Sequence, residues 1–452
     1  MIAIVTDVHY RMSLALIRDL GQAGVEVLTC ERESCRTSRV SPALGAMSRY
    51  TARHVWLPEE GYLDALWELC REVGEEKGRK PALLPVGAAT LGALAADRER
   101  FRQVCGLFVP TTEQLDLFNS KERVAALAAS LHISTPASYA REPGEDADAF
   151  ARRLPLPAVV KPVCGEKLGL GAAERYAVAR TAEEAAEAFR RFLALAGTDP
   201  VVQEHLPGAG LGCSVLARNG EVLSAICHRR LREYPVAGGP SSCCRVEERP
   251  DLADMARAMV RAAGYNGLAM FEFKEDSRGK PRLLEVNPRI WGTFPLTRVS
   301  RCGMSRLWCA LSWNAGNPED LVLLPRPREP QRGKMIFAAS DLMAAAGYAK
   351  RGQPGRALGA AADLVNPFVR DGLFEWGDMA PALAYFRSLV SRGGRTLTPI
   401  WWTSTSTPPP PPTAAPPWRT WPPRRNGRGW TPWPSATTTC APLCRRRWRG
   451  CC

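Results

Sequence analysis

The chain lacks the short motifs of several common nucleotide-binding and phosphotransfer classes. It has no G-x-x-x-x-G-K-[ST] phosphate loop, no H-R-D with D-F-G, and no G-x-G-x-x-G after its first apolar run. P-loop, kinase and dinucleotide-binding functions therefore have no motif support. No run of 18 apolar residues occurs, and the start MIAIVTDVHY has no cationic segment followed by an apolar one. We therefore expect no membrane partner, no secretion and a cytoplasmic location.

Cysteines are present but lack the pattern of a redox or metal motif. Eleven of the 15 cysteines precede residue 400, and no C-x-x-C occurs anywhere. Scattered thiols of this kind are typical of reduced, structural cysteines in a cytosolic protein.

Acidic residues are absent after Asp378, and the last part of the chain differs from the rest. Residues 401–452 contain eight Arg, no Lys and seven of the 13 Trp. Of the net charge of +14, the remainder of the chain therefore carries only +6, which suits an anionic nucleotide and requires no nucleic-acid partner. We predict a disordered low-complexity tail over 396–452. An arginine-rich binding tail and an out-of-frame translation are alternative interpretations, and the composition favours the second; sequencing the DNA across codons 390–400 would separate them.

The first hundred residues alternate strand and helix patterns. Apolar runs at 2–6, 25–30 and 82–86 predict strands, and helical spacing at 13–23 and 62–75 predicts the helices between them. This alternation predicts a parallel α/β layer. With 452 residues the chain is long enough for two or three domains.

The most informative segment is FEFKEDSRGKPRLLEVNPRIWGT, residues 271–293. Residues 268–274 and 281–287 are predicted strands around a polar turn, so the segment is a hairpin. Counting back from the turn pairs Glu272 with Glu285, and Asn287 follows on the same face. The opposite, core face is predicted to carry Phe271, Phe273, Leu284 and Val286.

The paired carboxylates predict a metal site. Facing positions of an antiparallel pair lie ~5 Å apart, and two bare carboxylates there repel by roughly 3 kcal/mol at an effective dielectric of 20. A divalent cation bound between the carboxylates turns this repulsion into a net attraction. Oxygen-only ligands favour Mg²⁺ or Mn²⁺ over zinc. An exposed hairpin with solvated carboxylates is the alternative. Pro288 and Arg289, which follow Asn287, disfavour this alternative, because Pro288 ends the strand and Arg289 places a permanent charge beside the proposed metal.

Glu272 and the run EVNPR, residues 285–289, resemble the metal-binding strands of the ATP-grasp superfamily, in the branch of the carbamoyl-phosphate synthase large subunit and the D-alanine:D-alanine ligases. The resemblance covers roughly residues 1–315. It implies an α/β N-terminal layer followed by an α+β ATP-grasp fold whose two subdomains clamp ATP. The domains expected are 1–115 for the N-terminal layer, 116–200 for the small subdomain, 201–315 for the large subdomain with the metal site, and 316–395 for a C-terminal helical extension.

The resemblance also implies contacts to the phosphates of ATP. Lys121 and Lys161 match the two lysines of the family, although Lys121 alone reads as an exposed helix lysine. Lys161 ends the apolar run 156–160, where an unpaired ammonium is costly to bury. The glycine-rich loop 165–171, with Lys167 and Gly169, could approach phosphate oxygens, and a simple tight turn is the alternative.

Two further segments complete the expected nucleotide site. VVQEHLPG, residues 201–208, resembles the hinge strand of the family, where Gln203, Glu204 and Leu206 would contact adenine. In HRRLREYP, residues 228–235, clustered cations favour an anionic partner, and Arg230 or Arg232 is expected to face the γ-phosphate or an acyl phosphate.

The activity implied is that of an ATP- and Mg²⁺-dependent ligase. It would join a small-molecule carboxylate to an amine, or to a thiol, through an acyl phosphate, with Arg289 at the transferring group. The alternative is a non-catalytic ATP-sensing module of the same fold, which would not need Arg289. The sequence leaves open which carboxylate and amine are used and the oligomeric state.

Overall fold

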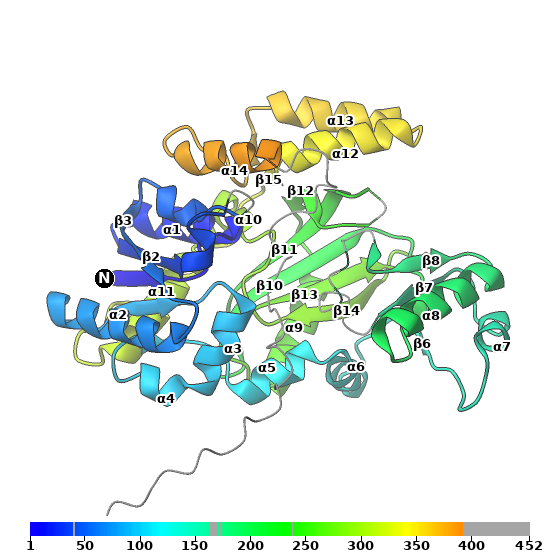
Figure 1. Ribbon diagram of the computed structural model, residues 1–452, viewed down its shortest axis with the longest axis horizontal. Helices are drawn as coiled ribbons and strands as arrows, with labels where there is room; N and C mark the ends of the chain where they lie inside the picture. The colour runs from blue at the N-terminus through cyan, green and yellow to red at the C-terminus, as the bar shows by residue number, and fades with distance from the viewer. Residues whose placement is uncertain (39–40, 163–167, 169, 171–173, 237, 392–452) are drawn as a thin grey trace, which may run out of the picture. The chain divides into compact units, whose positions relative to one another are not determined.

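The computed structural model describes residues 1–391, apart from 39–40, 163–167, 169, 171–173 and 237 (Figure 1). The predicted disordered tail over 396–452 lies outside these residues. Within the part described, no helix has both the length and the apolar character needed to cross a membrane.

The N-terminal layer is a five-stranded parallel sheet in the order β3-β2-β1-β4-β5. Its strands are β1 (Ile2–Val5), β2 (Glu26–Arg32), β3 (Thr51–Leu57), β4 (Ala82–Leu84) and β5 (Gly106–Leu107). Helices α1 (Arg11–Gln22) and α2 (Tyr62–Lys77) lie between them in sequence, as the spacing predicted. The parallel α/β layer predicted from the sequence is confirmed.

A small antiparallel sheet comes next, in the order β6-β9-β7-β8. The strands are β6 (Ser138–Tyr139), β7 (Ala158–Lys161), β8 (Ala177–Ala179) and β9 (Val201–Glu204), with helices α7 (Ala147–Arg152) and α8 (Ala182–Ala196) packed beside them through a core that contains Phe150, Phe189 and Phe192. Thr181 caps α8 by accepting a hydrogen bond from the backbone N–H of Glu184. Because β9 belongs to this sheet, the small unit extends past the boundary at 200 that the sequence suggested.

The largest sheet has seven strands in the order β14-β13-β10-β11-β12-β15-β16. They are β10 (Gly210–Arg218), β11 (Glu221–Glu233), β12 (Ser241–Val246), β13 (Gly267–Glu275), β14 (Pro281–Asn287), β15 (Lys334–Ile336) and β16 (Val369–Asp371). Asn219 and Gly220, both at positive φ, form the turn between β10 and β11. Strands β15 and β16 come from the segment 316–395, so that segment completes the sheet and is not only helical.

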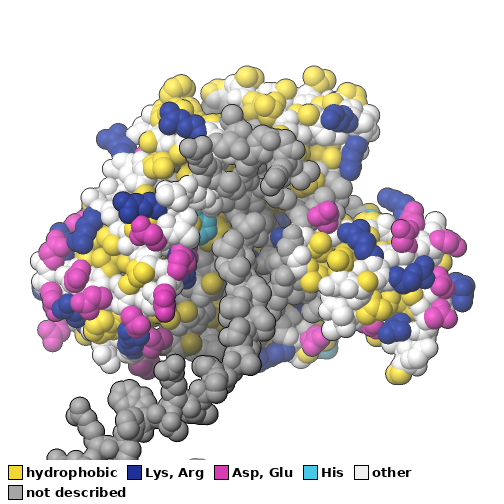
Figure 2. Space-filling view, in the orientation of Figure 1, with side chains coloured by type: hydrophobic (Ala, Val, Ile, Leu, Met, Phe, Trp, Pro, Cys, Tyr) yellow, Lys and Arg dark blue, Asp and Glu magenta, His cyan; other side chains and the backbone are white. Residues whose placement is uncertain are grey.

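The last described helices carry exposed apolar side chains. They are α12 (Ala338–Lys350), α13 (Pro354–Val365) and α14 (Ala380–Ser391). Figure 2 shows apolar side chains gathered over this part of the chain, and the exposed ones include Leu342, Leu358 and Val365. All three helices fall within 316–395, where the sequence analysis expected a helical extension.

The hairpin β13–β14 has the predicted facing pair and one departure from the predicted core face. Glu272 lies opposite Glu285, as counted from the turn. A β-bulge then makes Phe273 pair with Leu283, so Leu283 is buried in the core at 1% exposure and Leu284 is only half-buried. The assignment of Leu284 to the core face is therefore wrong, because the extra residue of a bulge shifts the alternation by one position.

Candidate active site

Two carboxylates and an amide converge on one face of the hairpin β13–β14. Asn287 Nδ2 lies 3.3 Å from Glu272 Oε1 and 3.4 Å from Glu285 Oε1, and donates a hydrogen bond to each. We call Glu272, Glu285 and Asn287 the acidic cradle. The three predicted metal ligands are thus brought together by the strand register.

Glycines on the neighbouring strand β10 open space beside the cradle. Gly212 lies opposite both Glu272 and His228, and a Cβ at Gly212 would lie 2.3 Å from His228 Cε1. Two residues earlier on β10, a Cβ at Gly210 would lie 3.0 Å from Arg230 Cδ. The absence of side chains at these two positions lets His228 and Arg230 of β11 lie over β10. The Gly-x-Gly pattern inside a strand was the available sequence signal for this site.

Arg230 contacts the cradle directly. Its Nη2 lies 2.8 Å from Glu272 Oε1, and its Nη1 lies 3.9 Å from Glu233 Oε1. Among the described residues, the buried Nε of Arg230 has no hydrogen-bond partner. A buried donor without a partner is costly, so an anionic ligand that accepts from Nε would stabilise the arrangement.

Burial and nearby charges shift the pKa of Glu272. Burial raises the pKa of Glu272, and Glu285 raises it further, while Arg230 opposes both. His228, close to Arg230 in sequence, has its pKa lowered to about 3 by burial and by Arg230, and its Nε2 lies 3.3 Å from Thr293 Oγ1. His228 is therefore neutral near pH 7 and has a structural place beside the cradle.

Two lysines, one on α6 and one at the end of β7, lie near Glu285. Helix α6 (Lys121–Ser130) packs against β14 and begins with Lys121, after the cap Ser120. The pKa of Lys161, at the end of β7, is lowered to about 8 by burial and then by the charge of Lys121, and Glu285 acts in the opposite direction. Lys121, Lys161 and Glu285 therefore lie close enough to interact, and the two lysines repel each other in the absence of an anion.

Two charged residues near the cradle were missed by the sequence analysis. Lys274 lies two positions after Glu272 on β13, so it shares the cradle's face. Its pKa is lowered by burial and by Arg230, and Glu233 opposes this shift. Glu233 and Lys274 thus belong to the same electrostatic cluster as Arg230. The position of Lys274 on the predicted strand was visible in the sequence, but the pairing of β10 between β11 and β13 was not.

Arg232, the alternative to Arg230 in the predicted phosphate contact, is bound to other side chains. Its Nε and Nη2 lie 2.9 and 2.6 Å from the carboxylate of Asp341, and Nη2 also lies 2.6 Å from Asp363 Oδ2. Ser242 donates a further hydrogen bond to Asp341. The guanidinium is buried and holds α12 and α13 against the sheet, so it has no place in the cradle.

The predicted adenine contacts lie on and after β9. Gln203 Nε2 donates to Ser138 Oγ over 3.1 Å, and Glu204 Oε2 accepts from the backbone N–H of Ala137 over 3.3 Å. Leu206 is buried. Both polar side chains therefore have partners on or next to β6. Their contact with adenine stays a prediction.

The remaining predicted residues are Arg289, Lys167 and Gly169. Arg289 is half-buried just after β14, and its Nη1 lies 3.2 Å from the carbonyl oxygen of Ile290. It lines a small hollow together with Leu268 and Trp308. Lys167 and Gly169 fall outside the described residues.

Comparison with known proteins places this site within a recognised fold. Residues 197–331, which include the whole acidic cradle, match the family described as ATP-grasp in the biosynthetic pathway with Ter operon. The comparison with curated proteins gave no match.

Solved structures of similar fold include several biotin carboxylases. The Campylobacter jejuni biotin carboxylase in complex with β,γ-ATP has a TM-score of 0.54 and 13% identity, over 74% of this chain and 74% of that one. The biotin carboxylase domain of the Hydrogenobacter thermophilus 2-oxoglutarate carboxylase, in complex with MgADP, ADP and bicarbonate, has a TM-score of 0.52 and 14% identity, over 73% and 71%. A biotin carboxylase domain of a single-chain bacterial carboxylase has a TM-score of 0.51 and 17% identity, over 74% and 73%. Likeness at this level of identity establishes the architecture: this chain has the ATP-grasp fold, and its residues 197–331 match an ATP-grasp family.

Proposed function

We propose that the chain is an ATP- and Mg²⁺-dependent ligase that joins a small carboxylate to an amine through an acyl phosphate. The observation that carries this proposal is the acidic cradle, flanked by Arg230 and facing Lys161. Acidic and basic groups lie close to one another there. Such an arrangement suits a metal-bound polyphosphate better than it suits either charge alone.

The donor set of the cradle fits Mg²⁺ or Mn²⁺. Glu272 and Glu285 offer carboxylate oxygens, and Asn287 offers an amide oxygen once its side chain turns over from its present hydrogen bonds to the two carboxylates. No sulfur or imidazole ligand is part of the cradle. When bound, the metal ion would neutralise charge on the phosphate oxygens.

The chain's own cations would hold the nucleotide and the transferring group. Lys121 and Lys161 would bind phosphate oxygens, which relieves their mutual repulsion. The free Nε of Arg230 would donate to a phosphoryl oxygen, and Arg289 would bind the substrate carboxylate or the acyl phosphate. Gln203, Glu204 and Leu206 would contact adenine at the hinge.

The proposed reaction has two steps. In the first, a carboxylate oxygen of the substrate attacks the γ-phosphorus, the bond from that phosphorus to the β,γ-bridging oxygen breaks, and ADP leaves. In the second, the amine nitrogen attacks the acyl carbon, inorganic phosphate leaves, and the nitrogen loses a proton. Both steps require positioning and charge neutralisation rather than a protein nucleophile, which suits a site made of cations and metal ligands. A thiol could replace the amine as acceptor.

An ADP-release assay tests the proposal. The full chain is supplied with ATP and Mg²⁺ together with small carboxylates, with bicarbonate included because it occurs in a similar structure, and with a range of amines and thiols. We expect ADP release that requires both a carboxylate and an acceptor. ATP binding without ADP release for any pair would contradict the ligase and favour the nucleotide-sensing alternative.

A further inference from the structure

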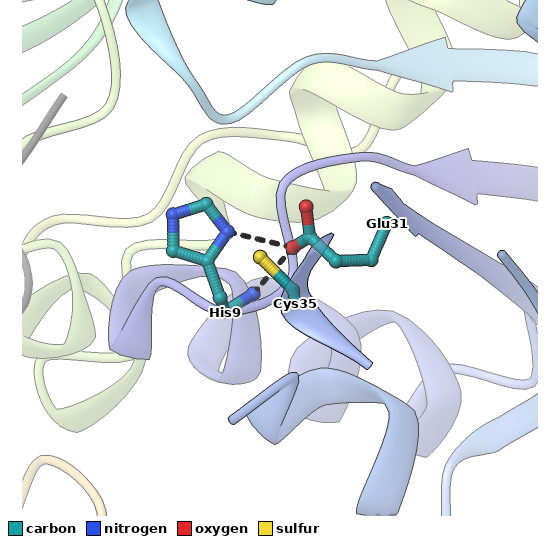
Figure 3. Close-up of side chains that lie close together, drawn as sticks. All are labelled: His9, Glu31 and Cys35. Atoms are coloured by element: carbon teal, nitrogen blue, oxygen red, sulfur yellow. Dashed lines mark hydrogen bonds and ion pairs between the residues drawn. The ribbon is translucent and has the colours of Figure 1, made fainter. Parts of the chain in front are cut away.

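A second group of potential metal ligands lies in the N-terminal layer and shares no residue with the acidic cradle. His9 lies after β1, Glu31 lies near the end of β2, and Cys35 ends the short helix η1 (Glu33–Cys35) that comes after β2. Figure 3 shows their side chains pointing toward one another. Because β1 and β2 are parallel neighbours, their carboxyl ends meet at one edge of the sheet, and this edge brings the three residues together.

The three side chains are close and one of them is firmly held. One ligand atom from each residue lies within 4.8 Å of the other two. Glu31 Oε2 lies 2.7 Å from His9 Nδ1 and 2.8 Å from the His9 backbone nitrogen, and Oε1 accepts from the Arg32 backbone N–H over 2.9 Å. The Glu31 side chain is only 1% exposed. The carboxylate is therefore fixed, and His9 and Cys35 stand beside it.

Cys35 differs from the other cysteines that the structure describes. Those other nine are all buried, whereas Cys35 is partly exposed. A buried thiol inside a core behaves as a small apolar side chain, and a partly exposed one beside an imidazole and a carboxylate is available as a ligand. The His9 side chain is also partly exposed, at 15%. An ion can thus reach the cluster from solvent.

We propose that His9, Glu31 and Cys35 bind a zinc-class divalent transition-metal ion. Imidazole nitrogen, thiolate sulfur and carboxylate oxygen are the three ligand types of zinc sites, and a thiolate disfavours Mg²⁺. At zinc–ligand distances of about 2.0–2.2 Å in a tetrahedron, the nitrogen and oxygen ligands would stand about 3.3–3.6 Å apart. The His9–Glu31 contact therefore needs to open by only a fraction of an ångström.

The site of His9, Glu31 and Cys35 differs from the acidic cradle in its ligand atoms, and it would leave one coordination position of the metal free. The cradle offers only oxygen ligands, so the two sites would select different metals from the same solution. Three protein ligands leave the fourth tetrahedral position for water or for a small ligand. Bound metal would also tie the segment after β1 to the segment after β2 in the N-terminal layer.

Zinc binding to the full chain, freed of metal with a chelator, tests the proposal. Zinc is added in competition with a chromophoric chelator, and cobalt is used in parallel to detect thiolate-to-metal charge-transfer absorption. The wild-type chain is expected to bind one zinc ion at a site that requires Cys35. Cys35→Ser and His9→Asn should each weaken that site about 100-fold and remove or shift the cobalt band.

Matched controls separate this site from other ligands of the chain. Cys440, Cys444, Cys451 and Cys452 lie outside the described residues, so a variant with all four changed to Ser reports their share of the zinc. The exposed His132 gives the control His132→Asn. Both controls should keep the Cys35-dependent zinc and the cobalt band. Melting without zinc confirms that Cys35→Ser remains folded.

Two outcomes would overturn the proposal. One is a wild-type chain that takes up no zinc in a Cys35-dependent manner. The other is zinc affinity and stoichiometry that are the same in Cys35→Ser, His9→Asn and the wild type. In either case the cluster would be an ion pair between His9 and Glu31 with an adjacent thiol.

Discussion

Arg230 and Arg232 lie two positions apart on β11, yet the fold gives them different surroundings. Arg232 is surrounded by acceptors, since Asp341 and Asp363 bind its guanidinium and Ser242 binds Asp341 in turn. Arg230 contacts one carboxylate of the cradle, and among the described residues its Nε has no acceptor. The hydrogen bonds of Arg232 are thus made within the protein, whereas Arg230 has a donor left for a ligand.

This difference indicates how a structural cation can be told from a functional one. A buried charge whose hydrogen bonds are all made within the chain holds elements together, and its loss leaves buried partners uncompensated. A buried charge with an unused donor, placed beside metal ligands, costs stability until a ligand arrives. Variants of the two arginines and of their surroundings can break or sharpen the contrast.

The largest effect is expected from Glu285→Ala. Removing one cradle carboxylate should lower ligand-dependent ADP release by at least about 10³-fold, because the metal loses a ligand and the phosphates lose their neutralising ion. The assay is ADP release at saturating Mg²⁺. Glu221→Ala, on the exposed start of β11, is the matched control and should retain activity. Unchanged turnover and Mg²⁺ dependence in Glu285→Ala would show that the cradle is not the metal site.

Arg232→Met should mainly affect stability. Asp341 and Asp363 would lose their buried partner, and we expect a decrease of about 3–5 kcal/mol in the free energy of unfolding. Lys334, whose Nζ lies 2.5 Å from Asp363 Oδ2, would compensate only that carboxylate. Denaturant unfolding measures the change. Arg245→Met, at an exposed side chain on β12, is the control. A loss below about 1 kcal/mol would contradict the structural role of Arg232.

Arg230→Met should show the reverse pattern. We expect turnover to fall by about 10²-fold because a donor to the transferring phosphoryl group is lost. The free energy of unfolding should change less than in Arg232→Met, since Glu272 keeps its hydrogen bond from Asn287. Measuring both quantities on both variants gives the comparison directly. Equal losses of stability in the two variants would remove the distinction between the arginines.

A smaller effect is expected from pH acting on Lys161. The pKa of Lys161 is lowered to about 8 in the ligand-free chain, first by burial and then by Lys121. Bound phosphate favours the ammonium form and so raises this pKa. ATP should therefore bind tightly below about pH 8, and its affinity should fall by about tenfold per pH unit above that value. Calorimetric titration with Mg·ATP over a pH series measures this dependence.

Lys161→Arg serves as the control for that pH dependence. Arginine keeps its charge throughout the range, so the loss of affinity above about 8 should disappear. A wild-type affinity that is independent of pH, or an identical decline in Lys161→Arg, would contradict the assignment of Lys161 to the phosphates.

The sequence could predict those parts of the site that depend on local geometry. The turn between the two strands sets the register, so the facing pair Glu272 and Glu285 could be found by counting alone. Leu284 was misplaced because a β-bulge leaves no reliable mark in the sequence. The parallel N-terminal layer could be predicted from the alternation of strand and helix periodicity.

Contacts over long sequence separations could not be predicted in this way. Arg232 finds Asp341 and Asp363 on helices more than 100 residues later, and nothing in the segment 228–235 distinguishes it from Arg230. His9, Glu31 and Cys35 were within reach of prediction, since each lies at or just after the end of a predicted parallel strand. Their convergence depends on β1 and β2 being neighbours in the sheet, and this strand order could be seen only in the structure.

Calorimetric titration of the full chain with ATP, with and without Mg²⁺, tests the central claim most directly. The wild type is compared with the double variant Glu272→Gln, Glu285→Gln, which keeps the size of both side chains and removes both charges. We predict that Mg²⁺ tightens ATP binding by at least about tenfold in the wild type and has no effect in the double variant. Wild-type binding that is the same with and without Mg²⁺, or a double variant that retains the full Mg²⁺ effect, would contradict it.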